Sequence, residues 1–306
     1  MLRQDLGMPP PGDIRSCMEA LANTEPVMRE LLHYRFTEGS LAGQSFGNLF
    51  LAALNGISPS FDAAVRRMSQ VLAITGRVLP VTTADVQLEA EFENGATVVG
   101  ESKIFYCKKQ EDCRIRQVRL IPSRPKALPE AVSAIADADM IVLGPGSLYT
   151  SVLASLIVPG IRDAVITSKA VMFNVCKVMT QPGETDGYGA YEHVRALIRH
   201  MGCQCLDYVV VNEQKASPDI LAKYEKEGAM PVSPDVEKIE QLGIDCVPAK
   251  LLNDSDLVRH NPLKLAKTII ALIYRLKLFG KGIRFFDYFF ARQTMQELRK
   301  HARKEH

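Results

Sequence analysis

The chain has 306 residues, enough for one large α/β domain or two small ones with a substantial core. Hydrophobic residues make up 47% of the chain and charged residues 24%, which excludes disorder, collagen and coiled coil as the main class. The formal net charge of +2 argues against a nucleic-acid-binding protein. The absence of Trp and an aromatic content of 7% argue against a stacking platform for single strands.

The seven cysteines are scattered and include no CxxC pair, which is typical of reduced thiols in a cytosolic protein. Cys203 and Cys205 are separated by a single residue, a spacing that arises by chance more often than in zinc sites. The sequence predicts no signal peptide, and its longest apolar run, near 268–273, is too short to span a bilayer. We therefore expect a soluble, cytoplasmic protein.

Residues 1–75 have the apolar period of helices. We expect Asp13 to cap the first helix, because it follows three prolines and a glycine. Pro26 suits the first turn of the second helix. The expected helices cover residues 14–21, 26–32, 45–54 and 61–74.

A β section follows these helices. Residues 86–92 alternate apolar and polar side chains, and Glu93-Asn94-Gly95 is a hairpin signal before a short strand at 97–99. Residues 115–120 predict another strand. We interpret this β-hairpin insertion as an edge layer of the fold rather than as a separate domain.

From residue 127 onward, short apolar strands alternate with helices. This order predicts an α/β fold with a mostly parallel sheet that helices cover on both faces. The expected strands cover 140–143, 171–178, 208–211 and 244–247, and the expected helices cover 131–136, 148–158, 191–201, 220–227 and a segment from Pro262.

Residues 275–306 differ in composition from the rest of the chain. They hold nine Lys and Arg against three acids, together with five of the twelve Phe. We interpret this tail as a helix that docks on its own domain or on a dimer partner. The alternative is a helix that lies weakly on a membrane surface, since basic and aromatic residues are mixed.

The strongest local signal for function lies in residues 141–151. A buried strand ends in the turn Gly144-Pro145-Gly146, and a helix opens at Ser147. Glycines allow a ligand to approach the backbone, and a helix N-terminus offers N–H groups and a partial positive charge, so this segment suits an anion. The alternative, that Ser147 only caps its helix and the glycines only turn the chain, stays open.

A second strand leads into the polar loop 179–187. If the two strands are neighbours in a parallel sheet, their loops line one crevice. Glu184 and Asp186 could hold a divalent cation or accept from a sugar hydroxyl. Acids are also favoured near a helix start for their charge alone, which is the simpler interpretation of Asp186.

Two further clusters, at 10–15 and 43–48, place a glycine and polar residues at helix starts and suit either ligand contact or capping. Arg15 could bind a phosphate through two N–H groups. We interpret His193 and His200 as surface or satisfied core groups. No GxSxG, HExxH or Walker motif is present.

Five motifs occur in a characteristic order: Pro-Pro-Gly-Asp-Ile-Arg at 10–15, Ser-Phe-Gly-Asn-Leu at 45–49, Gly-Arg-Val-Leu-Pro at 76–80, Val-Leu-Gly-Pro-Gly-Ser-Leu-Tyr-Thr-Ser at 142–151 and Met-Thr-Gln-Pro-Gly-Glu-Thr-Asp-Gly-Tyr at 179–188. With these motifs the chain resembles the bacterial gluconeogenesis factor (YvcK-like) family. That family is the bacterial branch of the CofD-like, or 2-phospho-L-lactate transferase, superfamily. The likeness covers residues 2–270 and leaves the tail outside.

The resemblance implies a Rossmann-like fold, a phosphate-binding crevice and a homodimer. It also implies a ligand like UDP-N-acetylglucosamine and a regulatory role in cell shape and wall synthesis during growth on gluconeogenic carbon. In the transferase branch the same crevice moves a phospholactyl-type group onto a deazaflavin. Carried over by position, the resemblance assigns phosphate or nucleotide-sugar contacts to Gly144, Gly146, Ser147, Leu148, Asn48, Thr180, Tyr224 and Arg259. We assign no catalytic residue, metal ligand or cofactor.

The chain departs from the family pattern at its start and at three positions. Family members begin with a strand and a Gly-rich loop, followed by a strand that leads to Asp-Asp-Gly-Gly, and we expect this chain to lack both units. Ser16, Gln44 and Lys177 stand where the family usually has Asn, His and Asn. These changes concern catalysis more than the fold class.

Three hypotheses about function stay open. The first is a regulatory protein that binds a nucleotide sugar, and the second is a transferase that acts on a phosphorylated three-carbon acid. The third is a diverged, non-catalytic copy that acts through its tail.

Overall fold

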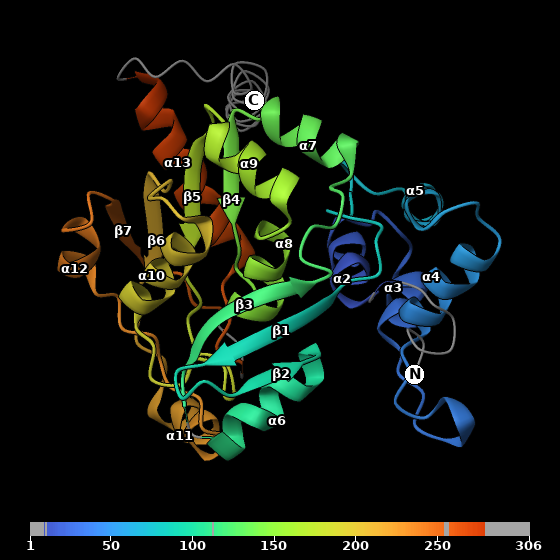
Figure 1. The fold of residues 1–306 in the computed structure, drawn as a ribbon, viewed down its shortest axis with the longest axis horizontal. Helices are drawn as coiled ribbons and strands as arrows, with labels where there is room; N and C mark the ends of the chain where they lie inside the picture. The colour runs from blue at the N-terminus through green and yellow to red at the C-terminus, as the bar shows by residue number, and fades with distance from the viewer. Residues whose placement is uncertain (1–8, 10, 112, 254–256, 279–306) are drawn as a thin grey trace, which may run out of the picture. The chain divides into compact units, whose positions relative to one another are not determined.

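The computed structural model describes residues 9, 11–111, 113–253 and 257–278 (Figure 1). The chain forms two compact units, and each is described by itself. Unit 1 comprises Met1–Ala136 and Ser147–Ser168, and unit 2 comprises Asp137–Gly146 and Lys169–His306. The predicted division into a domain at 1–274 and a tail at 275–306 stays a prediction, and the tail from residue 279 onward lies outside the described residues.

Unit 1 begins with four α-helices, which confirms the helical prediction for this region. They are α2 (Gly12–Leu21), α3 (Pro26–His33), α4 (Phe46–Gly56) and α5 (Phe61–Val71), with the short 3-10 helix η1 (Gly39–Leu41) before α4. Met18, Leu32, Leu51 and Met68 meet in a buried apolar cluster that joins the four α-helices. Removing this apolar surface from water holds the bundle together.

The first of these helices begins earlier than expected. Because α2 starts at Gly12, Asp13 lies in its first turn, and the prediction that Asp13 caps the helix is wrong. A carboxylate in the first turn still interacts favourably with the helix dipole. Ser45, in contrast, does cap α4, since its Oγ accepts a hydrogen bond from the backbone N–H of Asn48 at 3.2 Å.

Unit 1 also contains an antiparallel sheet with the strand order β2-β1-β3. The strands are β1 (Gln87–Phe92), β2 (Thr97–Val99) and β3 (Ile115–Ile121), and helix α6 (Glu101–Glu111) follows β2. The hairpin turns at Gly95, whose φ of +86° favours glycine. The β-hairpin expected from the sequence is confirmed, and its strands belong to an antiparallel sheet of their own in unit 1. That this layer is part of the same domain as the parallel sheet stays a prediction.

Four further helices complete unit 1: α7 (Pro129–Ala136), the π-helix η2 (Leu148–Leu153), α8 (Ala154–Leu156) and α9 (Pro159–Thr167). Together η2 and α8 confirm most of the helix that was predicted over 148–158. Tyr149 of η2 is fully buried, and its hydroxyl donates to the carbonyl of Ile115 at 3.2 Å. This hydrogen bond ties η2 to the antiparallel sheet.

Unit 2 is built on a parallel sheet with the strand order β4-β5-β6-β7, as the alternation of strands and helices predicts. The strands are β4 (Met140–Leu143), β5 (Val171–Val175), β6 (Tyr208–Asn212) and β7 (Asp245–Ala249). The helices are α10 (Ala190–Met201), α11 (Pro218–Lys226), α12 (Val236–Glu240) and α13 (Pro262–Leu278).

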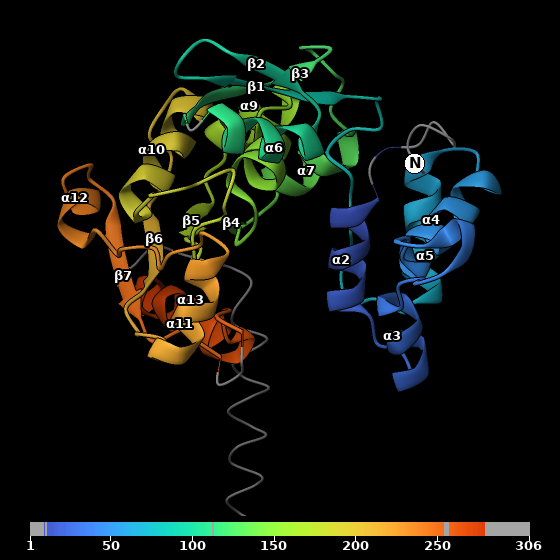
Figure 2. The same cartoon turned by 90° about the horizontal axis from the view of Figure 1, so that it is seen from below.

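Helices α13 and α10 cover opposite faces of this sheet, as Figures 1 and 2 both show. Val171, Phe173 and Val175 of β5 share a buried cluster with Ile273 of α13. Because side chains alternate along a strand, the residues between them, including Asn174, point to the face that α10 covers. The fold class expected from the sequence, an α/β fold with helices on both faces of a parallel sheet, is confirmed.

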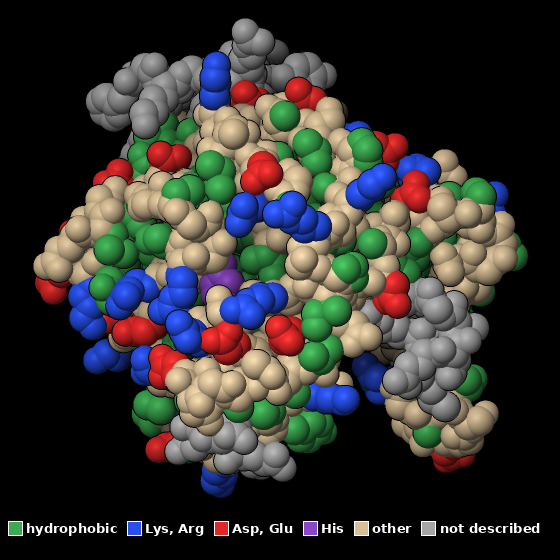
Figure 3. Space-filling view, in the orientation of Figure 1, with side chains coloured by type: hydrophobic (Ala, Val, Ile, Leu, Met, Phe, Trp, Pro, Cys, Tyr) green, Lys and Arg blue, Asp and Glu red, His purple; other side chains and the backbone are tan. Residues whose placement is uncertain are grey.

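The described surface carries mixed charge. On the face drawn in Figure 3, acidic and basic side chains are interspersed, in keeping with a net charge of +2. None of the described helices is by itself long and apolar enough to cross a membrane. Segment Leu148–Leu156 and α9 are long and apolar enough for a membrane span only when taken together, and this pair is bent by 78°.

The side chains of Ser233 and Asp235 pack so closely against Gly189 of unit 2 that we expect alanine at this position to destabilise the fold. A Cβ atom there would overlap Oδ2 of Asp235. That carboxylate is held in place, because Oδ2 accepts from Ser233 Oγ at 2.9 Å and Oδ1 accepts from Lys238 Nζ at 3.1 Å. We expect Gly189→Ala to lower the free energy of unfolding by about 1–3 kcal/mol, measured by urea denaturation.

Gly56→Ala is the matched control, because nothing lies within 4 Å of the Cβ position at Gly56, the last residue of α4. It should leave the free energy of unfolding unchanged or raise it by up to about 1 kcal/mol. Equal stability of the two variants would contradict the packing described at Gly189.

Candidate functional site

The loop after β4 has the strand, turn and helix expected of an anion-binding segment. β4 ends at Leu143, and Gly144 has a φ of +79°, a conformation that favours glycine. Gly144 and Gly146 are half-buried. Ser147 is half-buried as well, and Leu148, the first residue of η2, is buried. The first N–H groups of a helix have no acceptor within that helix, so such a start favours a negatively charged ligand.

The parallel pairing of β4 with β5 brings the two predicted loops to the same edge of the sheet. Leu143 is the register partner of Asn174, so both strands end at the same level. In addition, Asn174 Nδ2 donates to the carbonyl of Leu143 at 3.2 Å. The condition that the sequence left open, that these two strands are neighbours, is therefore met in unit 2.

Hydrogen bonds within the chain hold the loop after β5. Lys177 Nζ donates to Gln181 Oε1 at 2.6 Å, and the backbone N–H of Gln181 donates to Thr185 Oγ1 at 2.9 Å. The N–H of Gly183 donates to Asp186 Oδ2 at 2.9 Å. The carboxylate of Asp186 thus supports the loop itself, in line with the simpler interpretation of this residue.

Polar groups are concentrated where β5 ends, and we call Asn174, Lys177, Glu184 and His193 the β5 polar cluster. Three of them are buried, with exposed fractions of 5% for Asn174, 3% for Glu184 and 3% for His193. Burial lowers the pKa of Lys177, and the Glu184 carboxylate opposes this shift. The cluster therefore places a partly buried cation beside a buried acid at the carboxyl end of the sheet.

The β5 polar cluster contains buried acceptor atoms that lack a hydrogen-bond partner within the described part of the chain. Asn174 Oδ1 and His193 Nε2 are among them. His193 Nδ1 lies 2.8 Å from the carbonyl of Gly189, so Nδ1 carries the hydrogen and Nε2 is left as an acceptor. A buried acceptor without a donor is costly, which marks this part of unit 2 as a candidate for function.

Thr180 is committed to the backbone of a neighbouring segment. Its Oγ1 accepts from the N–H of Met230 at 2.8 Å, and its own N–H donates to the Met230 carbonyl at 2.7 Å. Thr180 is 5% exposed. The phosphate contact assigned to it by resemblance stays a prediction.

Tyr224 and Arg259, the two residues assigned to the nucleotide sugar, lie in adjoining segments of unit 2. The hydroxyl of Tyr224, on α11, accepts from the backbone N–H of Val258 at 3.1 Å, next to Arg259. Tyr224 is half-buried and Arg259 is exposed. The segment that carries Arg259 therefore lies against the hydroxyl end of Tyr224.

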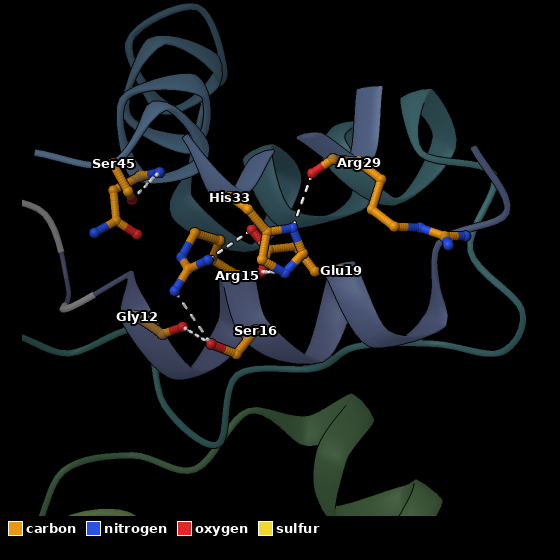
Figure 4. A network of polar contacts seen from close by, with 8 residues as sticks. Gly12, Arg15, Ser16, Glu19, Arg29, His33 and Ser45 are labelled. Atoms are coloured by element: carbon orange, nitrogen blue, oxygen red, sulfur yellow. Dashed lines mark hydrogen bonds and ion pairs between the residues drawn. The ribbon is translucent and has the colours of Figure 1, made fainter. Parts of the chain in front are cut away.

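Asn48 lies in α4 of unit 1, where the motifs at 10–15 and 45–49 pack against each other. A Cβ atom on Gly47 would lie 2.7 Å from Cδ of Arg15, so the glycine allows the arginine to cross α4 closely. Figure 4 shows Arg15 Nη1 paired with Glu19 Oε1, at 2.6 Å. Arg15 therefore has an acidic partner within the protein, whereas the sequence suggested a phosphate.

One side-chain oxygen of Asn48 lacks a hydrogen-bond donor among the described residues. This atom, Asn48 Oδ1, is buried, while the backbone N–H of the same residue is bound by Ser45. Its assignment to a ligand stays a prediction. No group of three or more His, Cys, Asp and Glu side chains is gathered as a metal site in the described ranges.

The sequence did not point to Asn174 as a residue of the candidate site. It also assigned no ligand contact to Lys177 or His193. Asn174 is the one polar residue in the strand Val171–Val175, which is buried throughout. An amide inside so apolar a strand needs a hydrogen-bonding role, and this was the available signal. His193 follows the loop on α10, but only the fold shows that its ring is buried.

The buried histidines predict a loss of stability in mild acid. Burial lowers the pKa of His193, His200 and His260, so the unfolded chain binds protons near pH 6.5 that the folded protein does not. The free energy of unfolding should fall as the pH drops from 7.5 to 5.5, by at most about 1.4 kcal/mol per pH unit for each histidine. Urea denaturation at several pH values in high salt would measure this fall.

His193→Asn tests the same prediction at one site, because asparagine keeps a donor for the Gly189 carbonyl but does not titrate. This variant should lose less stability between pH 7.5 and 5.5 than the unmodified chain. An equal or larger loss would contradict a buried, neutral His193.

The comparisons with known proteins agree with this architecture. The family model of 2-phospho-L-lactate transferase CofD matches residues 1–252. A relative from Thermoanaerobacterium thermosulfurigenes is 50% identical over 274 residues, which are 89% of this chain and 84% of that protein. The gluconeogenesis factor of Bacillus subtilis (strain 168) is 43% identical over 274 residues, which cover 89% of this chain and 85% of its own length.

A crystal structure from Bacillus halodurans, of a protein of the UPF0052 family, superposes with a TM-score of 0.84 at 42% identity. The match covers 88% of this chain and 86% of that one. The resemblance to bacterial gluconeogenesis factors expected from the five motifs is thus confirmed, and the chain belongs to the CofD family.

Proposed function

We propose that this member of the CofD family is a regulatory protein that binds a nucleotide sugar similar to UDP-N-acetylglucosamine. The observation that carries the proposal is the pairing of β4 with β5, which brings the loops at 144–146 and 177–189 to one edge of the parallel sheet. Ligands of open α/β sheets bind outside the carboxyl ends of the strands. The relatives named gluconeogenesis factors support a role in carbon metabolism.

The chemistry of this edge suits a phosphate next to a sugar. The glycine turn, with its positive φ at Gly144, suits close approach of an anion to the backbone, and Lys177 adds a positive charge. Asn174 and His193 supply acceptors for hydroxyl groups. Tyr224 could stack on a uracil, and Arg259 could hold a diphosphate through paired N–H groups.

The regulatory target in this proposal is cell shape and wall-precursor supply, as the resemblance implies. We also propose that the chain forms a homodimer, which light scattering on the purified protein would test. Contact between the tail at 275–306 and a membrane surface stays a separate proposal, and sedimentation with anionic vesicles would test it.

A transferase is the second candidate, because the matching family model is that of a phospholactyl-type transferase. This alternative requires transfer of the group to a deazaflavin acceptor. Mass spectrometry of the acceptor after incubation with the chain and a phosphorylated three-carbon donor would detect the product.

Calorimetric titration with UDP-N-acetylglucosamine tests the main proposal. We expect saturable heat with a dissociation constant below the millimolar range, and no heat at millimolar ligand would contradict the proposal. Gly146→Val should abolish binding, because a branched side chain blocks approach to the backbone. Circular dichroism would verify that the variant is folded, and unchanged affinity would mean that the turn is only architectural.

A pair of variants at Tyr224 tests the nucleobase contact. Tyr224→Leu should weaken binding of UDP-N-acetylglucosamine by about 1–3 kcal/mol, the usual contribution of stacking on one base. Tyr224→Phe keeps the ring and loses only the hydroxyl that Val258 contacts, so its affinity should stay close to that of the unmodified chain. Equal losses in the two variants would contradict stacking.

A further inference from the structure

Unit 1 contains a cavity of about 340 Å³ that the proposed function does not use. All of its lining residues belong to unit 1, from α2, α5, the segment that leads into β1, the antiparallel sheet, the start of α6 and the helices η2 and α8. Its volume is within the range of about 300–1,000 Å³ that small-molecule sites have. The cavity is therefore large enough for a compact organic group.

The wall of this cavity is mostly apolar. Phe61, Val78, Leu88 and Leu120 contribute to it, and Phe61, Leu88 and Leu120 have exposed fractions of 6%, 8% and 6%. Water in such a space makes few hydrogen bonds with the wall. Displacement of that water by an apolar group is favourable.

The mouth of the cavity is acidic. Asp13, Cys17 and Glu101 line the cavity and are exposed, so the cavity opens to solvent on their side. Burial and, after it, the Asp13 carboxylate raise the pKa of the Cys17 thiol, which indicates that the negative charge of Asp13 acts on the lining. Lys, Arg and His are absent from the described residues that line the space.

The arginine of the same helix does not compensate for these acids. Arg15 is not among the lining residues, and its guanidinium is paired with Glu19, as Figure 4 shows. Among the described residues that line the cavity, a phosphate or carboxylate would therefore meet the carboxylates of Asp13 and Glu101 and no Lys, Arg or His side chain. This composition is opposite to that of the edge of the parallel sheet, where Lys177 and backbone N–H groups favour an anion.

We propose that this cavity is a second ligand site, which takes an uncharged, mainly apolar molecule or group and excludes anions. Apolar walls supply the affinity, and the carboxylates at the mouth accept from an N–H or O–H group of the ligand. The hydroxyls of Ser151 and Ser155 add polar contacts on the side of η2 and α8. The site is distinct in chemistry from the one proposed for the nucleotide sugar.

Two matched fluorescent probes test the proposal. N-phenyl-1-naphthylamine is uncharged and has one N–H, and 8-anilino-1-naphthalenesulfonate has the same rings with an added sulfonate. Titrated into the full chain, the uncharged probe should bind at one site per chain. The sulfonate should bind with an affinity at least roughly tenfold lower, because the carboxylates repel its negative charge. Equal affinity of the two probes, or no binding of the uncharged one, would overturn the proposal.

Variants test whether the probe binds inside the cavity. Ala154→Phe fills part of the space and should reduce binding of the uncharged probe at least tenfold. Ala53→Phe is the control, since Ala53 is exposed on α4 and does not line the cavity. The double variant Asp13→Asn, Glu101→Gln keeps the shape of the cavity and removes both negative charges. It should therefore reduce the difference in affinity between the two probes. An unchanged difference would contradict exclusion by charge.

Alkylation of Cys17 gives a second test, which uses the unmodified chain instead of a cavity-filling variant. Cys17 lines the cavity and is exposed, so the bound uncharged probe should slow its modification by N-ethylmaleimide. Cys113 does not line the cavity and serves as the control. Peptide mass spectrometry should find protection at Cys17 alone, and protection of neither thiol would overturn the assignment of the site.

Discussion

The parallel pairing of β4 with β5 is the constraint on which the proposed site depends. Their register, together with the hydrogen bond from Asn174 Nδ2 to the Leu143 carbonyl, makes the two strands end at one level. Two loops that are distant in sequence thereby share one edge of the sheet. Without this pairing, the glycine turn and the loop that follows Lys177 would be separate, and neither alone offers both backbone donors and a cation.

The β5 polar cluster gives this edge its chemical character. Lys177 is partly buried next to Glu184, and burial and then the Lys177 charge lower the pKa of His193, which favours its neutral form. The edge thus combines positive charge for phosphate with neutral acceptors for hydroxyl groups. The cavity of unit 1 has the reverse composition, with carboxylates at the mouth and apolar walls. We therefore propose that one chain of the CofD family presents two environments suited to different ligands.

Much of this architecture follows from the order of apolar segments. The buried strands of unit 2 read as short apolar runs, and the glycine turn after Leu143 marks the loop for which we propose anion binding. The sequence does not predict α6, because its apolar residues follow no helical period, and it does not separate the antiparallel sheet from the parallel one. Arg15 was suggested as a phosphate ligand, and in the structure its Nη1 pairs with Glu19, which lies one helical turn away.

The central claim is that the two loops at the edge of the parallel sheet hold the nucleotide sugar together. Hydrogen–deuterium exchange with and without UDP-N-acetylglucosamine tests it most directly, because it reports on backbone N–H groups along the whole chain. The account predicts that saturating ligand slows exchange in peptides that cover 144–148 and 177–189. Unchanged exchange in both segments, with protection elsewhere in the chain, would contradict it.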